Sequence, residues 1–132
     1  MAYVEKNSVF IFPGEHFGIR VKANNDEISQ VAYEKDAGKA DVEFKFSAQG
    51  QFMMLTIENR LNHTLYLDAG MRIPKRSEFF KTTILPVRAK LAGFESWPHP
   101  IFELVLRNIR FQPKVANRAV SLRLLALRGI RE

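Results

Sequence analysis

The side chains best suited to acid–base or metal chemistry are three histidines and 14 carboxylic acids. The histidines, His16, His63 and His99, are far apart, and their spacing does not predict a shared metal ion. The chain lacks a G-x-S-x-G nucleophile elbow, an H-E-x-x-H zinc motif, a G-x-x-x-x-G-K phosphate loop and any cysteine. No glycosidase-like carboxylate pair stands out. We therefore expect a non-enzymatic protein without catalytic residue, cofactor or metal.

The most distinctive local sequence is FESWPHP at residues 94–100, which holds the only tryptophan. It ends the longest segment that we expect to be irregular, residues 89–100. Each proline restricts the residue before it to an extended conformation, which predicts a stiff loop. Aromatic side chains in preordered loops contribute strongly to binding, so Trp97 and His99 are candidates for contact with a partner. The alternative is that Trp97 folds back and closes the open end of the core.

A second candidate surface is the charged loop that runs from Pro74 to Lys81. Its adjacent phenylalanines, Phe79 and Phe80, cannot both point inward unless the loop is bulged. Phe79 is therefore a candidate for an exposed contact residue. The alternative is a solvated loop with one of the two rings buried.

The entire net charge of +6 lies in residues 107–132, because the first 106 residues carry 13 basic and 13 acidic side chains. A clustered positive field attracts polyanions, so nucleic acid or anionic lipid is a candidate partner. Phe111 is the one aromatic residue after Phe102, so the sequence does not indicate an exposed aromatic platform, and the RNP, KH and helix-turn-helix patterns are absent. The alternative is that these arginines flank an edge strand and block aggregation, and that some of them pair with acids of the first 106 residues. The candidate contact residues are Arg107, Arg110, Arg118, Arg123 and Arg128.

The elements that position these residues are short runs of β-branched and aromatic residues interrupted by turn residues, a pattern typical of strands. Residues 42–47 alternate apolar and polar side chains, and a tight hairpin is expected at residues 49–51. Residues 52–57 are apolar on both faces, which suits a strand covered on two sides or by a loop. Residues 120–128 fit a strand or a helix, and we favour a strand. About eight strands predict an all-β, antiparallel sandwich or barrel in one domain, residues 1–132.

The segment LTIENRLNHTLYLDA, residues 55–69, favours the sandwich. In it an apolar strand is followed by an asparagine, a short polar turn and a second alternating strand. An asparagine suits such a turn because its side chain bonds local backbone groups. The segment resembles immunoglobulin-like β-sandwiches of the accessory and partner-binding kind found in secreted or envelope proteins of bacteria, without pointing to a specific family. The Cys…Trp…Cys core of antibody domains is absent.

We therefore expect a binding or accessory module that contacts a protein partner in the bacterial cell envelope. Two alternatives stay open: polyanion binding through the basic C-terminal residues, and carriage of a small apolar ligand in a cavity lined by residues 52–57. No apolar run is long enough to predict a transmembrane segment. The first residues do not resemble a signal peptide, which fits a chain trimmed at a cleavage site as well as a cytosolic one. We favour a periplasmic or secreted location, and the oligomeric state stays open.

Overall fold

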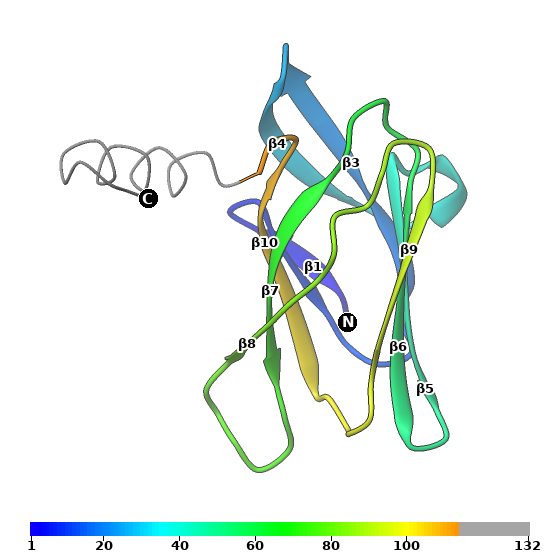
Figure 1. Ribbon diagram of the computed structural model, residues 1–132, viewed down its shortest axis with the longest axis vertical. Helices are drawn as coiled ribbons and strands as arrows, with labels where there is room; N and C mark the ends of the chain where they lie inside the picture. The colour runs from blue at the N-terminus through cyan, green and yellow to red at the C-terminus, as the bar shows by residue number, and fades with distance from the viewer. Residues whose placement is uncertain (114–132) are drawn as a thin grey trace, which may run out of the picture.

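The computed structural model describes residues 1–113, which form two antiparallel β-sheets of five strands each (Figure 1). In chain order the strands are β1 (Tyr3–Glu5), β2 (Ser8–Ile11), β3 (His16–Asn24), β4 (Glu27–Glu34), β5 (Val42–Gln49), β6 (Phe52–Asn59), β7 (Tyr66–Arg72), β8 (Phe80–Thr82), β9 (Ala92–Trp97) and β10 (Glu103–Arg110). A 3-10 turn, η1 (Ala37–Lys39), is the one helical element in this part of the chain. The expected all-β class with antiparallel pairing is confirmed. Residues 120–128 lie outside the described residues.

The two sheets have different strand orders. The first sheet runs β1-β2-β10-β7-β8, and the second runs β4-β3-β5-β6-β9. Every pairing within them is antiparallel. The edges of the first sheet are therefore two strands of three residues, whereas the edges of the second are longer strands of eight and six residues.

The β5–β6 hairpin follows its sequence pattern closely. Its register pairs Val42 with Asn59 at one end and Gln49 with Phe52 at the other. Gly50 lies in the tight connection with φ +65°, a left-handed conformation that glycine adopts without strain. The inward side chains at alternate positions of β5 are fully buried, as the alternation predicts.

The core lies between the sheets, and alternate residues of both contribute to it. The largest fully buried side chains are Phe17, Phe44, Phe46, Ile11, Ile19, Leu55, Ile57, Leu65, Leu104, Leu106 and Val9. The rings of Phe17 and Phe44 stack with their centroids 5.5 Å apart. On β6 the inward residues belong to this core, but Phe52 on the other face is 52% exposed. The expected cover on both faces of this strand is therefore incomplete.

Asn59 joins the turn after β6 to the segment that precedes β9. The residue is fully buried. Its Nδ2 donates hydrogen bonds to the carbonyl oxygens of His63 at 2.9 Å, Val87 at 3.0 Å and Arg88 at 3.3 Å. Its Oδ1 accepts from the backbone N–H of Leu61 at 3.0 Å. The expected role of an asparagine in this turn is confirmed, and it extends to a distant part of the chain.

Candidate functional site

Trp97 lies in the core and does not project from a loop. Residues 92–97, in the segment expected to be irregular, form β9 and pair with β6, so that Trp97 stands opposite Met53. The Trp97 side chain is only 7% exposed, its Nε1 donates to the Thr82 Oγ1 at 3.0 Å, and its ring packs edge-on against Phe46. The prediction that Trp97 presents its ring to a partner is wrong. The strand places the ring on the inward face, and the two prolines stiffen only the turn that follows.

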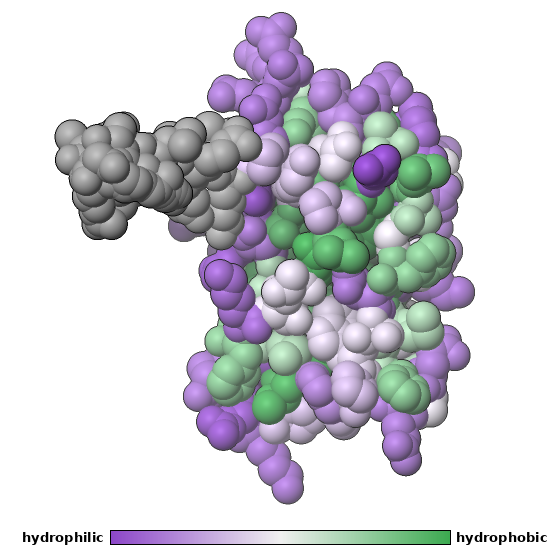
Figure 2. Space-filling model, in the orientation of Figure 1, coloured by the Kyte–Doolittle hydropathy of each residue, from purple (hydrophilic) through white to green (hydrophobic). Residues whose placement is uncertain are grey.

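His99 lies in that turn, where it meets the β7–β8 hairpin at one end of the molecule (Figure 1, lower end). Between them is a hollow of about 570 Å³ whose surface is mostly apolar. We call it the apolar hollow; it is lined by Met71, Ile73, Pro74, Arg76, Phe80, His99 and Pro100. Figure 2 shows apolar residues gathered at this lower end, over the β7–β8 hairpin, with hydrophilic residues beside them.

A second hollow, of about 460 Å³, adjoins the first because the two share Ile73, Pro74 and Arg76. We call it the cationic hollow; it is lined by Arg72, Ile73, Pro74, Lys75, Arg76, Ser77 and Phe102. Three of these seven side chains carry a positive charge, and none carries a negative one. Arg72 and Arg76 are paired with Glu103 and Glu78, which lie outside the lining. Lys75 therefore supplies the net positive charge that favours an anionic group in this hollow.

Arg72 is held in place by three neighbours. Its Nε and Nη2 donate to the same Oε1 of the buried Glu103, at 3.1 and 2.5 Å. Its guanidinium lies 4.7 Å from the ring centroid of Phe102 and 5.9 Å from that of Phe79. Both rings are exposed on their outer sides, so Phe79 is exposed as the sequence indicated. The ion pair and the two cation–π contacts hold this pair of aromatic rings ready at the surface.

The other cations of the hollow are more accessible. Arg76 stacks over Phe80 at 5.6 Å and pairs with Glu78 at 3.5 Å, and the side chains of both ion-pair partners are more than half exposed. Such an exposed pair is worth about 0–1 kcal/mol, so a ligand carboxylate competes with it easily. Lys75 is exposed and forms no ion pair within residues 1–113.

The basic residues of β10 do not form a free stripe. Arg107 is exposed and stands opposite Asp68 of β7, and Arg110 Nη1 lies 3.4 Å from an Asp68 carboxylate oxygen and 2.7 Å from the Asn108 carbonyl oxygen. β10 pairs with β2 on one side and β7 on the other. The pairing with β2 spans residues 104–106, and the pairing with β7 extends to Arg110. Protection of a sheet edge by these arginines stays a prediction from the sequence. The candidates Arg118, Arg123 and Arg128 lie outside the described residues.

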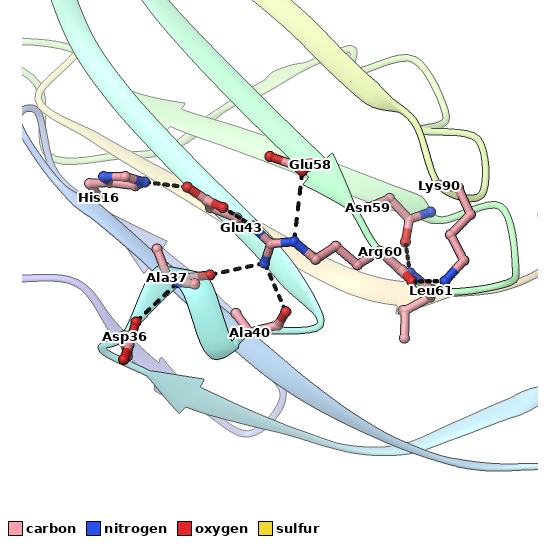
Figure 3. A network of polar contacts seen from close by, with 11 residues as sticks. His16, Asp36, Ala37, Ala40, Glu43, Glu58, Asn59, Arg60, Leu61 and Lys90 are labelled. Atoms are coloured by element: carbon pink, nitrogen blue, oxygen red, sulfur yellow. Dashed lines mark hydrogen bonds and ion pairs between the residues drawn. The ribbon is translucent and has the colours of Figure 1, made fainter.

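The largest polar network among the described residues surrounds Glu43 (Figure 3). The Glu43 carboxylate bonds to His16 Nε2 and Arg60 Nη2. The hydrogen bond from His16, together with that from Arg60, lowers the pKa of the Glu43 carboxyl below 4.5, against an opposing effect of burial. Arg60 Nη1 also donates to the carbonyl oxygens of Ala37 and Ala40, both at 2.9 Å. This network ties η1 to the sheet, which is a structural role.

The three histidines have different neighbours. His16 bonds to Glu43, His63 stacks on Phe111 with ring centroids 4.3 Å apart, and His99 borders the apolar hollow. Within residues 1–113 no group of three or more His, Asp or Glu side chains is placed to hold a metal ion. The same residues contain no helix with the length and hydropathy of a membrane span.

No protein-family model, curated protein or solved structure matches the chain. The two hollows are therefore interpreted from their geometry.

Proposed function

We propose that this protein is a non-enzymatic binding module with an immunoglobulin-like sandwich, and that it binds a protein partner at the end of the sandwich. The observation that carries the proposal is that the apolar hollow and the cationic hollow are adjacent, since Ile73, Pro74 and Arg76 line both. The two antiparallel sheets and the turn held by Asn59 support the immunoglobulin-like assignment. Location in the bacterial cell envelope stays a prediction from the sequence.

The residues that line the two hollows indicate which side chains of a partner would fit them. An apolar side chain enters the apolar hollow, and a neighbouring carboxylate of the same segment meets Arg76 and Lys75 in the cationic hollow. Phenylalanine and arginine are residue types enriched at protein interfaces, and Phe79, Phe102 and Arg72 supply them here in a fixed arrangement. Little conformational entropy is then lost at these side chains on binding, which favours affinity.

The contacts of the groups beside the hollows, as far as residues 1–113 are concerned, favour binding over catalysis. The buried carboxylate of Glu103 is bonded to Arg72. His99 lies at the rim of the apolar hollow, and its Nδ1 is 3.1 Å from the carbonyl oxygen of Pro100. These contacts do not pair the imidazole with a nucleophile or with a second acid, which supports a binding function over an enzymatic one.

Photo-crosslinking tests the proposal. A benzophenone amino acid placed at Phe102 is compared with the same group at Phe52, because both residues are 52% exposed but Phe102 lines the cationic hollow and Phe52 lines neither of the two hollows. We expect a crosslinked partner at position 102 in a lysate of the producing cells. The variant Arg76→Glu should reduce its yield about tenfold, which corresponds to about 1.4 kcal/mol.

Arg76 is exposed, so its replacement leaves the fold intact, which an unchanged unfolding curve checks. Equal crosslinking at positions 52 and 102, no crosslinking at position 102, or a yield that does not depend on Arg76 would each refute the proposed site.

A further inference from the structure

The outer edge of β9 is open. Within the described residues β9 pairs with β6 alone. The N–H of Leu91 donates to the carbonyl oxygen of Arg88 at 3.1 Å, and the N–H of Asn59 donates to the carbonyl oxygen of Leu91 at 2.9 Å, so the carbonyl group of Leu91 points toward β6. Backbone groups alternate in direction along an antiparallel strand. Those of Ala92, Phe94 and Ser96 therefore point toward the open edge.

This edge lacks the protection that the other edges of the two sheets have. β1 and β8 have only three residues each, and the eight-residue β4 carries a glutamate at each end. The one charged residue of β9, Glu95, accepts a hydrogen bond from the N–H of Leu85 at 2.9 Å and so is directed toward the segment beside the strand. Short length, charge and cover by a loop are the usual means of preventing edge pairing. Residues 84–87 lie beside β9 on the side of Gly93, but no backbone hydrogen bond joins them to β9 in the part of the chain that the structure describes. The other face of β9, with Ala92, Phe94 and Ser96, carries no charge.

Apolar side chains surround the open edge. Phe94 is 67% exposed, and Leu85 and Leu91 are also exposed. Figure 2 shows apolar residues over the segment that crosses the front of the molecule and over β9 beside it. An apolar surface beside unpaired backbone groups is the combination that strand addition uses, since the backbone supplies hydrogen bonds and the side chains supply contact area.

We propose that β9 pairs antiparallel with β9 of a second copy of this chain, which joins their second sheets into one continuous sheet. In a register centred on Phe94, that residue stands opposite Phe94 of the second copy and exchanges both backbone hydrogen bonds with it. Ala92 then stands opposite Ser96, with the same orientation toward the edge.

The occupant is a second copy because this register is self-complementary. It places each Glu95 opposite Gly93 of the other strand, so like charges do not oppose each other across the pair. It places two phenylalanines directly across, an arrangement that favours antiparallel pairing. The same edge is used by both molecules, so the two-fold contact closes at two copies. β9 has six residues, which makes this contact smaller than a standard interface of about 1,600 Å² and predicts a weak dimer.

Sedimentation velocity on the full chain tests the proposal between about 10 µM and about 1 mM, where weak dimers associate. We expect a monomer at the lower end and a growing dimer toward the upper end. Phe94→Lys, which places a charge on the edge, should raise the dissociation constant at least about tenfold. Phe52→Lys is the matched control and should leave the dissociation constant unchanged, because Phe52 is also an exposed phenylalanine, on β6, that lies outside the open edge and both hollows.

Amide hydrogen exchange supplies a second measurement on the unmodified protein. The Phe94 amide should exchange rapidly in dilute samples and slowly in concentrated ones, whereas the Gly93 amide, which points toward β6, should be protected in both. A monomer at every concentration, a dimer that Phe94→Lys leaves intact, or a Phe94 exchange rate independent of concentration would each overturn the proposal. These readouts do not involve the two hollows, so they stand or fall independently of the proposed function.

Discussion

Replacement of Asn59 measures how much one buried polar side chain contributes to this fold. Asn59→Ala removes four hydrogen bonds, three donated by Nδ2 and one accepted by Oδ1. The carbonyl oxygens of Val87 and Arg88 each keep another backbone donor. Two groups are therefore left without their partner, the carbonyl of His63 and the N–H of Leu61.

The expected cost follows from these two groups. An orphaned buried donor or acceptor costs about 1–3 kcal/mol. Leu61 and His63 are half-exposed, so water can partly replace the lost partner, and the lower half of that range applies. We therefore expect Asn59→Ala to lower the free energy of unfolding by about 3 kcal/mol, a large fraction of the 5–15 kcal/mol typical of a domain. Asn59→Asp should cost more at neutral pH, because it buries a negative charge against three carbonyl oxygens.

Equilibrium unfolding in urea, followed by circular dichroism, measures these differences. Asn62→Ala is the matched control in the same turn; Asn62 is exposed, so its replacement should change stability by less than about 0.5 kcal/mol. If Asn59→Ala destabilised the protein no more than Asn62→Ala, the bonds of Asn59 would not hold the two segments together, and the reasoning would be refuted.

Two further predictions concern Trp97 and Glu43. Trp97→Ala should lower the free energy of unfolding, measured in urea, by about 3–5 kcal/mol. Trp97→Phe should lower it by about 1–2 kcal/mol, because the hydrogen bond to Thr82 is lost. An unchanged free energy of unfolding in Trp97→Ala would place the ring at the surface. The pKa of the Glu43 carboxyl is lower in the folded protein than its value of 4.5 in the unfolded chain. The ionised carboxylate therefore stabilises the fold at pH values above 4.5, and this stabilisation is lost as the pH falls through the pKa of the folded protein. Glu43→Gln should therefore be less stable than the wild type at neutral pH and lose less stability below pH 4.5; parallel pH curves would contradict this.

The β5–β6 hairpin and the Asn59 turn could be predicted because their determinants are local. Alternation along residues 42–47 assigns the buried face, Gly50 permits the tight connection, and an asparagine bonds backbone groups a few residues away. Each of these features depends on residues that are neighbours in the chain, so the sequence pattern carries the information.

The candidate site could be predicted only in part. The sequence indicated Phe79 and His99, but it did not indicate Arg72 or Phe102, which complete the cationic hollow. The pairing of β10 with β7 brings Glu103 opposite Arg72, and that register joins residues about 30 positions apart. The adjacent phenylalanines in the charged loop and the proline-flanked His99 were the local signals for this end of the molecule.

The sequence by itself determined the all-β class, the antiparallel hairpins, the absence of thiol chemistry and the concentration of positive charge after residue 106. The tertiary structure decided which face of β9 carries Trp97, which strand lies beside Arg107 and Arg110, and which loops meet around the two hollows. The physical reason is that alternation marks two faces of a strand without saying which strand lies beside it. Neighbours across a sheet are selected by long-range register and by packing of the whole core, and the site and the open edge of β9 depend on those neighbours.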